Sequence, residues 1–291
     1  MLRQERSTNF HTPLHERSLL AQLYNGSVLP MPRRLTADSA WGALSCRVET
    51  LSYVINAADY VAHYRDVPRF LACCRQCPSY GMTWTCPPFE KDGYEREESD
   101  GRTHFNSPPV TDEEQEHCER REQGKTTTVN TNSALSRPSF SFLEEPSGGT
   151  FLLIGTRMTF DNATRRLSTT VEQRDSITQT VINTVMSDVE AMHRRWENDC
   201  PGSRAFLFSR CRQCHPQPCT RPSGLPCRHP DRMRPSLEAL GFNLARTADE
   251  LLKMPLQWSS DEQLPDYLTL ITAQLLPKHT DIVLQTADDT V

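Results

Sequence analysis

Eleven cysteines dominate the chemistry that this sequence could perform, and eight of them fall into two short groups. The first group lies between residues 73 and 86, and the second between residues 211 and 227. A C-x2-C spacing lets the backbone curl around a metal ion so that both thiolates reach it. Each group contains this spacing. Because we expect no secretory signal, the clustering favours metal binding or redox chemistry over a disulfide framework.

The two groups differ in the number of ligands that they offer. The second places four cysteines within 17 residues, with the pattern C-x2-C-x4-C-x7-C, and could complete a tetrathiolate site alone. The first offers three well-spaced thiols, one short of such a site. We therefore expect the two groups to build one region, in which the second supplies or neighbours the missing ligand.

Two metal centres fit this ligand set, and the residues leave the choice open. A [4Fe–4S] cluster needs four thiolates, often in a compact run followed by proline, as at Cys86-Pro87. A structural zinc ion needs four tetrahedral ligands, which the C-x2-C pairs of the two groups would supply together. We favour the iron–sulfur cluster, with zinc as the alternative and thiols without metal as a third reading.

Both groups resemble the signatures of a family of predicted metal-binding proteins, domain of unknown function 2284. Residues 74–89 carry C-x2-C-x2-Y-G-x2-W-x-C-P-P-F, and residues 226–241 carry P-C-R-H-P-x3-R-P-S-L-E-A-L-G. The resemblance covers about residues 48–94 and 151–255 in the same order. It implies seven metal-ligand candidates: Cys74, Cys77, Cys86, Cys211, Cys214, Cys219 and Cys227.

The sequence departs from the family pattern in the second group. The spacing between Cys214 and Cys219 is two residues longer than the family motif has, and Ser209-Arg210 replaces an expected glycine. These changes leave the type of centre open. His215 and His229 flank the group, and we expect both to be surface or supporting residues.

Composition narrows the function classes. The formal net charge is −5, which argues against a generally basic nucleic-acid binder. No apolar run is long enough to span a bilayer. No nucleotide-binding, zinc-protease or serine-hydrolase motif is present, so the sequence identifies no catalytic residue. We expect a cytoplasmic metal-binding protein with an electron-transfer or redox-accessory role and a redox partner protein; the zinc alternative is a structural interaction module.

The chain divides by composition. Residues 1–45 are polar and are expected to form a poorly ordered leader. The stretch from Glu95 to Thr150 has twelve acidic residues, six basic ones and only nine apolar ones. We expect it to be a disordered acidic insertion, because it cannot bury enough apolar surface to offset its ordering entropy. Residues 46–94 and 151–291 would then form one cysteine-rich domain.

Hydrophobic spacing predicts the elements that position the cysteines. Strands are expected at residues 49–55, 151–160, 205–208 and 242–245. Helices are expected at residues 57–65, 177–196, 236–240 and 247–254. Their predicted caps are Asn56, Ser176 and Thr247 at the starts of the first, second and fourth helices, and Gly241 at the end of the third. Residues 267–275 fit either a strand or a helix. The predicted fold is α/β or α+β, a small sheet with helices that delivers a strand into each of two cysteine-rich metal-binding loops.

Overall fold

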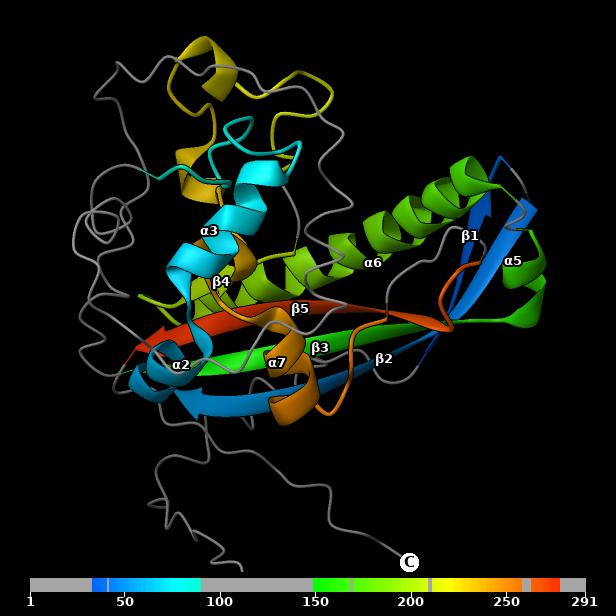
Figure 1. Ribbon diagram of the computed structural model, residues 1–291, viewed down its shortest axis with the longest axis horizontal. Helices are drawn as coiled ribbons and strands as arrows, with labels where there is room; N and C mark the ends of the chain where they lie inside the picture. The colour runs from blue at the N-terminus through cyan, green and yellow to red at the C-terminus, as the bar shows by residue number, and fades with distance from the viewer. Residues whose placement is uncertain are drawn as a thin grey trace, which may run out of the picture.

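The computed structural model describes residues 33–40, 42–89, 149–167, 170–208, 211–257 and 263–277. It has an α+β fold: one antiparallel sheet of five strands in the order β1-β2-β3-β5-β4, with helices on both faces (Figure 1). The strands are β1 (Arg33–Ser39), β2 (Gly42–Asn56), β3 (Gly149–Phe160), β4 (Arg204–Phe206) and β5 (Tyr267–Pro277).

The sheet starts earlier in the chain than expected. Strand β1 pairs with the first half of β2 through a register that runs from Arg33 opposite Val48 to Ser39 opposite Gly42. Residues 33–39 and 42–45 therefore lie in strands of the sheet, although they fall in the predicted leader. Leu44 is 1 % exposed, so burial on the sheet stabilises this segment despite its polar composition. The acidic stretch lies outside the described residues except at its end, since β3 begins at Gly149.

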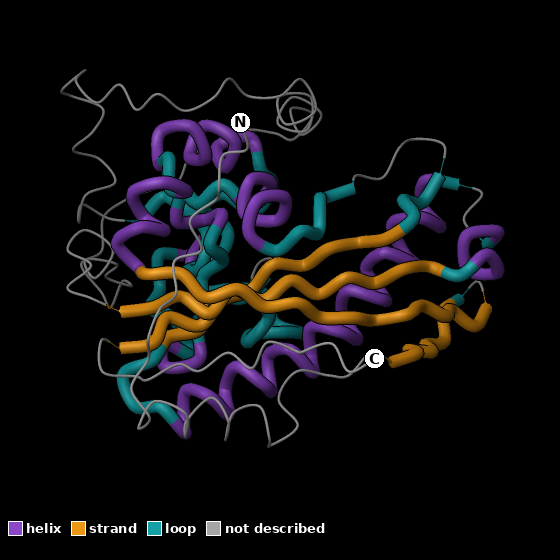
Figure 2. The backbone as a smooth tube through the Cα atoms, turned by 90° about the horizontal axis from the view of Figure 1, so that it is seen from below, coloured by secondary structure: helices purple, strands orange, loops and turns teal. Residues whose placement is uncertain are grey.

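One long helix, α6 (Val171–Asp199), covers one face of the sheet (Figure 2). The helical spacing of Ile177, Val181, Val185 and Val189 is confirmed, and all four side chains are buried. Each such burial stabilises the fold by about 1.5–3 kcal/mol. The predicted cap at Ser176 is wrong. The helix starts earlier because Thr170 and Gln173 form a reciprocal capping box.

The opposite face carries the shorter helices. Helix α2 (Ala57–Tyr64) begins at the predicted cap Asn56, whose side chain accepts from the backbone of Ala58 at 2.9 Å. Helix α7 (Leu244–Arg246) continues into a π-helical turn at Thr247–Leu251. The cap is Asn243, whose side chain accepts from Arg246 at 2.8 Å, so the predicted cap at Thr247 is wrong. The predicted strand at residues 242–245 is also wrong, since only Phe242 forms an isolated bridge, with Arg65.

Alternation along β3 divides the core between the two faces. Phe151 and Leu153 pack with the residues of α2, whereas Met158 and Phe160 pack with the valines of α6. Both sets are nearly inaccessible to solvent, which is why this strand reads as a continuous apolar run. Strand β5 pairs with β3 along its length, and this pairing settles residues 267–275 as strand.

The remaining helices are short. Helix α5 (Asn162–Arg166) follows β3, and 3-10 turns occupy Arg221–Ser223, Pro230–Arg232 and Glu238–Leu240. Helix α3 (Val67–Gln76), which the hydrophobic pattern did not indicate, begins at Asp66, whose carboxylate accepts from the backbone of Arg69 at 3.2 Å. It carries the first cysteines.

Gly241 fixes the packing of α3 against the C-terminal half of the chain. It ends the 3-10 turn with a φ of 89°, as predicted for a helix-terminating glycine. A Cβ built here would lie 2.9 Å from the Cα of Val67, at the start of α3. The Gly241 carbonyl also accepts from the backbone of Asp66 at 2.7 Å. Only glycine satisfies both the backbone conformation and the close approach.

A buried polar cluster joins α6 to β5. The ring of His193 is fully buried, with Nδ1 2.9 Å from Gln274 Oε1 and Nε2 2.9 Å from Thr272 Oγ1. Gln274 donates to Ser203 at 2.9 Å. Burial lowers the pKa of His193 from 6.5 to about 4, although its bond to Gln274 opposes the shift. The ring is therefore neutral at physiological pH.

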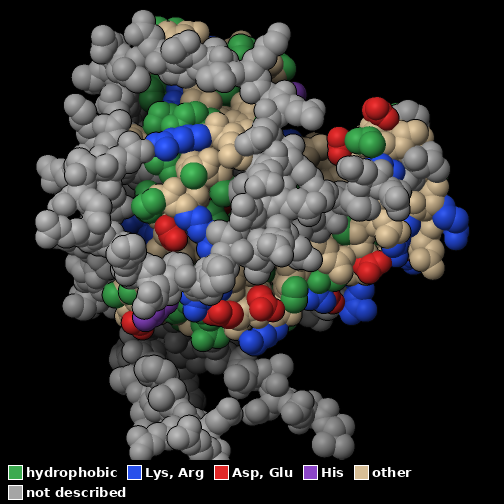
Figure 3. All heavy atoms as spheres, in the orientation of Figure 1, with side chains coloured by type: hydrophobic (Ala, Val, Ile, Leu, Met, Phe, Trp, Pro, Cys, Tyr) green, Lys and Arg blue, Asp and Glu red, His purple; other side chains and the backbone are tan. Residues whose placement is uncertain are grey.

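Arginines lie at the end of the molecule formed by β1 and α5, on the face shown in Figure 3. Several are paired with acids: Arg34 lies 3.3 Å from Asp161, and Arg165 lies 2.6 Å from Asp266. These pairs are largely exposed, so each contributes little to stability. Within the described residues, no helix is long and apolar enough to cross a membrane.

Candidate metal centre

The first cysteine group spans the end of α3 and the loop that follows, residues 77–89, called here the first cysteine loop. Cys74 lies in the last turn of α3, and Cys77 caps the helix and donates from its backbone to the Cys74 carbonyl at 3.0 Å. The C-x2-C pair is thus delivered by a helix, which corrects the expectation that a strand delivers it. The pair therefore lies where α3 ends and the first cysteine loop begins.

Tight backbone bonds fold the first cysteine loop back on itself. The backbone of Tyr80 donates to Cys77 at 2.9 Å, and that of Gly81 donates to Pro87 at 2.8 Å. Gly81 has a φ of 69°, which permits the reversal. As a result Cys86 returns toward Cys77, close enough for the two sulfur atoms to interact electrostatically.

The Cys86 sulfur lies in a mostly buried, polar setting. Thr83 Oγ1 donates to it at 3.2 Å. Burial raises the pKa of the Cys86 thiol, and the Cys77 sulfur raises it further, whereas the Thr83 bond and the Arg221 guanidinium oppose the shift. A hydroxyl donor and a cation near the sulfur suit a metal-bound thiolate, because both stabilise negative charge.

The second group lies in residues 211–229, the second cysteine loop, which follows β4 as predicted. Its backbone turns are local: Gln217 donates to the Cys214 carbonyl at 2.8 Å, and Leu225 donates to Thr220 at 3.3 Å. The Thr220 hydroxyl donates to the Pro226 carbonyl at 2.8 Å and closes the loop around residues 220–226.

The sulfur atoms of Cys214 and Cys219 lie close enough to Cys211 and Cys227 to affect the pKa of those two thiols. Burial raises the pKa of the Cys211 thiol to about 11, and the sulfur atoms of Cys227, Cys219 and Cys214 raise it further, against a hydrogen bond from the Gln213 backbone. Burial also raises the pKa of Cys227, which accepts from the His229 backbone at 3.4 Å. These cysteines are free thiols. Metal binding would therefore have to displace their protons.

The two cysteine loops contact each other directly, and Figure 1 shows them side by side near α3. The Cys211 backbone N–H donates to Thr85 Oγ1 at 3.1 Å. Trp84, which is 6 % exposed, donates from its indole nitrogen to Thr220 Oγ1 at 3.3 Å. The loops thus build one region of the molecule, and not two opposite ends.

Arg221 makes the largest set of contacts between the loops. Its buried guanidinium donates to the Thr83 carbonyl at 2.6 Å and also to the carbonyls of Cys86 and Pro88. Its charge lies 5.5 Å from the centroid of the Trp84 ring. The second cysteine loop therefore places the Arg221 cation among the backbone carbonyls of the first cysteine loop.

The donor set fits a thiophilic metal, since it consists of sulfur atoms with nearby N–H and O–H donors and a cation. Within the described residues, however, no three His, Cys, Asp or Glu side chains are placed to hold a single ion. The seven cysteines are gathered in one region, and their role as ligands stays a prediction. Cys118, expected to be incidental, lies outside the described residues, and His215 is exposed as expected.

Sequence reasoning did not single out the residues that join the loops. Trp84 is buried where it bonds to Thr220. Thr85, Thr220 and the specific role of Arg221 were missed. Arg221 was one of five arginines around the second group, and only its burial, at 9 % exposure, distinguishes it from its neighbours. No local signal marks such a residue.

The second half of the chain matches a known protein family. Residues 149–276 match the family described as "Predicted metal-binding protein (DUF2284)". The DUF2284 match contains β3, α6, β4, the whole second cysteine loop and most of β5. It confirms the family resemblance in the second half of the chain, and the family as a whole is predicted to bind metal. No curated protein and no solved structure matches the chain.

Proposed function

We propose that this protein binds an iron–sulfur cluster through Cys211, Cys214, Cys219 and Cys227 and serves electron transfer or a redox enzyme. The observation that carries the proposal is the placement of these four free cysteines on one loop, where the sulfur atoms of Cys214 and Cys219 lie close enough to Cys211 and Cys227 to raise the pKa of those two thiols. Four thiolates on a compact loop are the usual ligands of a [4Fe–4S] cluster, which supplies reversible one-electron transfer when bound.

The chain's own residues would tune such a centre. The backbone N–H groups of Gln213 and His229 already point at Cys211 and Cys227, and donors of this kind stabilise sulfur that carries negative charge. Trp84 and the first cysteine loop shield one side from water. Solvent exclusion and hydrogen bonds to the sulfur atoms are two of the factors by which a protein sets the reduction potential of a cluster.

We also propose a cytoplasmic location and a redox partner protein. A cytoplasmic location would keep the thiols reduced and available. Arg212 and Arg228 are exposed on the second cysteine loop, so a redox partner protein with an acidic surface would be attracted to it.

A structural zinc ion is the second candidate, favoured by one contact. The hydrogen bond from Cys211 to Thr85 places the two C-x2-C pairs, Cys74–Cys77 and Cys211–Cys214, in the same region. Four sulfur ligands from two such pairs form a common zinc site. The protein would then be an interaction module whose two halves are joined by metal.

Anaerobic purification followed by iron, sulfide and zinc analysis tests the two candidates. A brown protein with equal amounts of iron and sulfide supports the cluster, whereas a colourless protein with stoichiometric zinc supports the alternative. Absence of both metals would contradict both. The variant Cys219→Ala sharpens the distinction, because it removes a ligand of the proposed cluster and leaves the four proposed zinc ligands intact.

A further inference from the structure

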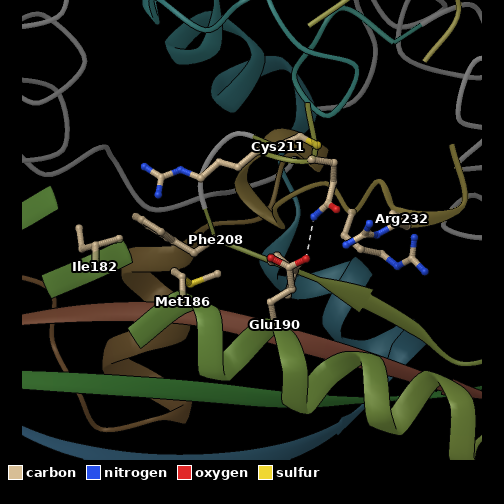
Figure 4. A pocket seen from close by; sticks show the side chains of 10 residues that line it. Ile182, Met186, Glu190, Phe208, Cys211 and Arg232 are labelled. Carbon is tan, nitrogen blue, oxygen red and sulfur yellow. Dashed lines mark hydrogen bonds between the residues drawn. The ribbon is translucent and has the colours of Figure 1, made fainter. Parts of the chain in front are cut away.

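A small hollow of about 50 Å³ lies between the middle of α6 and the start of the second cysteine loop (Figure 4). Ile182, Met186 and Glu190 line it from α6, and Phe208 and Cys211 line it from the segment that leads into the loop. In the figure, Phe208 and Met186 are seen on one side of Glu190 and Arg232 on the other. The hollow thus adjoins the four-thiol set through Cys211 and extends from it toward α6.

One wall of the hollow is apolar. Ile182 and Met186 are one turn apart on α6, and with Phe208 they are partly buried against the valine core of that helix. All three side chains line the hollow. Such a wall suits a short hydrocarbon group, because covering apolar surface is favourable at about 25 cal/mol per Å².

The charged side of the hollow carries an excess of cations: Arg212, Arg232 and Arg234 line it, against the single carboxylate of Glu190. Glu190 already accepts from Gln213 Nε2 at 2.6 Å and from Arg194.

Of the three arginines, Arg212 and Arg232 are not paired with a carboxylate of the described residues, whereas Arg234 is. Arg234 is held in a two-bond pair with Glu197, at 2.6 and 2.8 Å. Arg212 bonds to the neutral amide oxygen of Asn183, which leaves its charge uncompensated. Arg232 is exposed, on the 3-10 turn Pro230–Arg232, and forms no ion pair with any described residue. The hollow therefore combines an apolar wall with at least two cations not neutralised by a carboxylate.

We propose that this hollow binds a small amphipathic anion, a carboxylate with a short hydrocarbon chain. The planar carboxylate would bond to the guanidinium of Arg232, for which it is a matched partner, and the chain would lie on Met186 and Phe208. The size of the hollow limits the chain to a few carbon atoms. This binding goes beyond the proposed function and does not require a particular metal, although it would place the ligand beside Cys211.

NMR of the full-length protein labelled at the methionine methyl groups tests the proposal, with butyrate as the probe. The Met186 methyl signal, assigned by its loss in Met186→Leu, is expected to shift with a saturable dependence on butyrate. Butan-1-ol, which has the same chain without charge, is expected to give no saturable shift. Inorganic phosphate, which has charge without a chain, is expected to bind more weakly than butyrate.

Two arginine variants complete the test. Arg232→Gln is expected to weaken butyrate binding by about five- to tenfold, the effect of one charge-assisted bond. Arg228→Gln is the matched control, because Arg228 is equally exposed but bonds to the Pro218 carbonyl and does not line the hollow. The absence of a saturable Met186 shift, an equal response to butan-1-ol, or unchanged binding in Arg232→Gln would each overturn the proposal.

Discussion

The guanidinium of Arg221, in the second cysteine loop, donates a hydrogen bond of 2.6 Å to the backbone carbonyl of Thr83 in the first. The residues are 138 positions apart in sequence, and the contact is buried. Together with the bonds of Arg221 to Cys86 and Pro88, it makes the position of one loop depend on the other. The zinc candidate requires that arrangement, because its ligands come from both loops.

Replacing Arg221 is therefore expected to loosen both loops. In Arg221→Lys, a single ammonium cannot reproduce the planar set of bonds to three carbonyls, and buried acceptors lose partners. We expect the free energy of unfolding to fall by about 2–4 kcal/mol, with reduced metal content in the purified protein. Urea unfolding and metal analysis measure the two effects. Arg228→Lys, at an exposed position, should change neither, and equal effects in both variants would contradict the prediction.

Substitutions of the cysteines in the second loop are expected to distinguish the loss of a metal ligand from the loss of core packing. Cys211→Ala and Cys214→Ala should lose bound metal and unfold more easily, because metal binding is coupled to folding. Cys46→Ala serves as the control, since Cys46 is 1 % exposed in the core beneath α6 and far from the loop in the fold. It should lower stability by about 1 kcal/mol and keep the metal. Full metal content in both loop variants would remove this loop from the site.

His193 makes the stability depend on pH. Its pKa is about 4 in the folded protein and 6.5 when unfolded, so the unfolded state binds the proton first as the pH falls. Its contribution is complete above pH 6.5 and is lost progressively down to about pH 4, for a total on the order of 3 kcal/mol.

Urea unfolding between pH 7.5 and 4 tests this dependence against the variant His193→Gln, which has no titrating ring. The difference in unfolding free energy between the two proteins should shrink as the pH falls. Parallel curves for the two proteins over this range would show that the ring does not titrate as proposed.

Two glycines allow the close approach at α3 to be tested separately from backbone strain. Gly241 and Gly224 both have positive φ, 89° and 68°, but only a Cβ at Gly241 would meet other atoms within 4 Å. Gly224→Ala should cost about 1 kcal/mol for the backbone alone. Gly241→Ala should cost at least twice as much, because the Cβ would displace Val67 and with it α3. Thermal unfolding of both variants measures the difference.

The sequence by itself determined the local elements and the ligand chemistry. The valine spacing predicted α6, the apolar run predicted β3, and Asn56 and Gly241 marked a helix start and a turn end, because each of these signals acts within a few residues. The cysteine spacing and the family resemblance likewise predicted a cysteine-rich region with metal-ligand chemistry, because a C-x2-C pattern is local.

Only the tertiary structure decided what depends on long-range contact. Leu35 and Leu44 appear in a polar leader by composition, yet the sheet beside α6 buries Leu44 and partly covers Leu35. The placement of Thr85 against Cys211, and of Arg221 against Thr83, joins segments more than 120 residues apart. Such pairs leave no periodicity in the sequence, since their partners meet only when the sheet has brought α3 and the segment after β4 together. The physical reason is that a buried cation or hydroxyl is stable only where carbonyl and N–H groups around it form hydrogen bonds with it. Those groups come from distant parts of the chain, so the neighbouring sequence does not predict them.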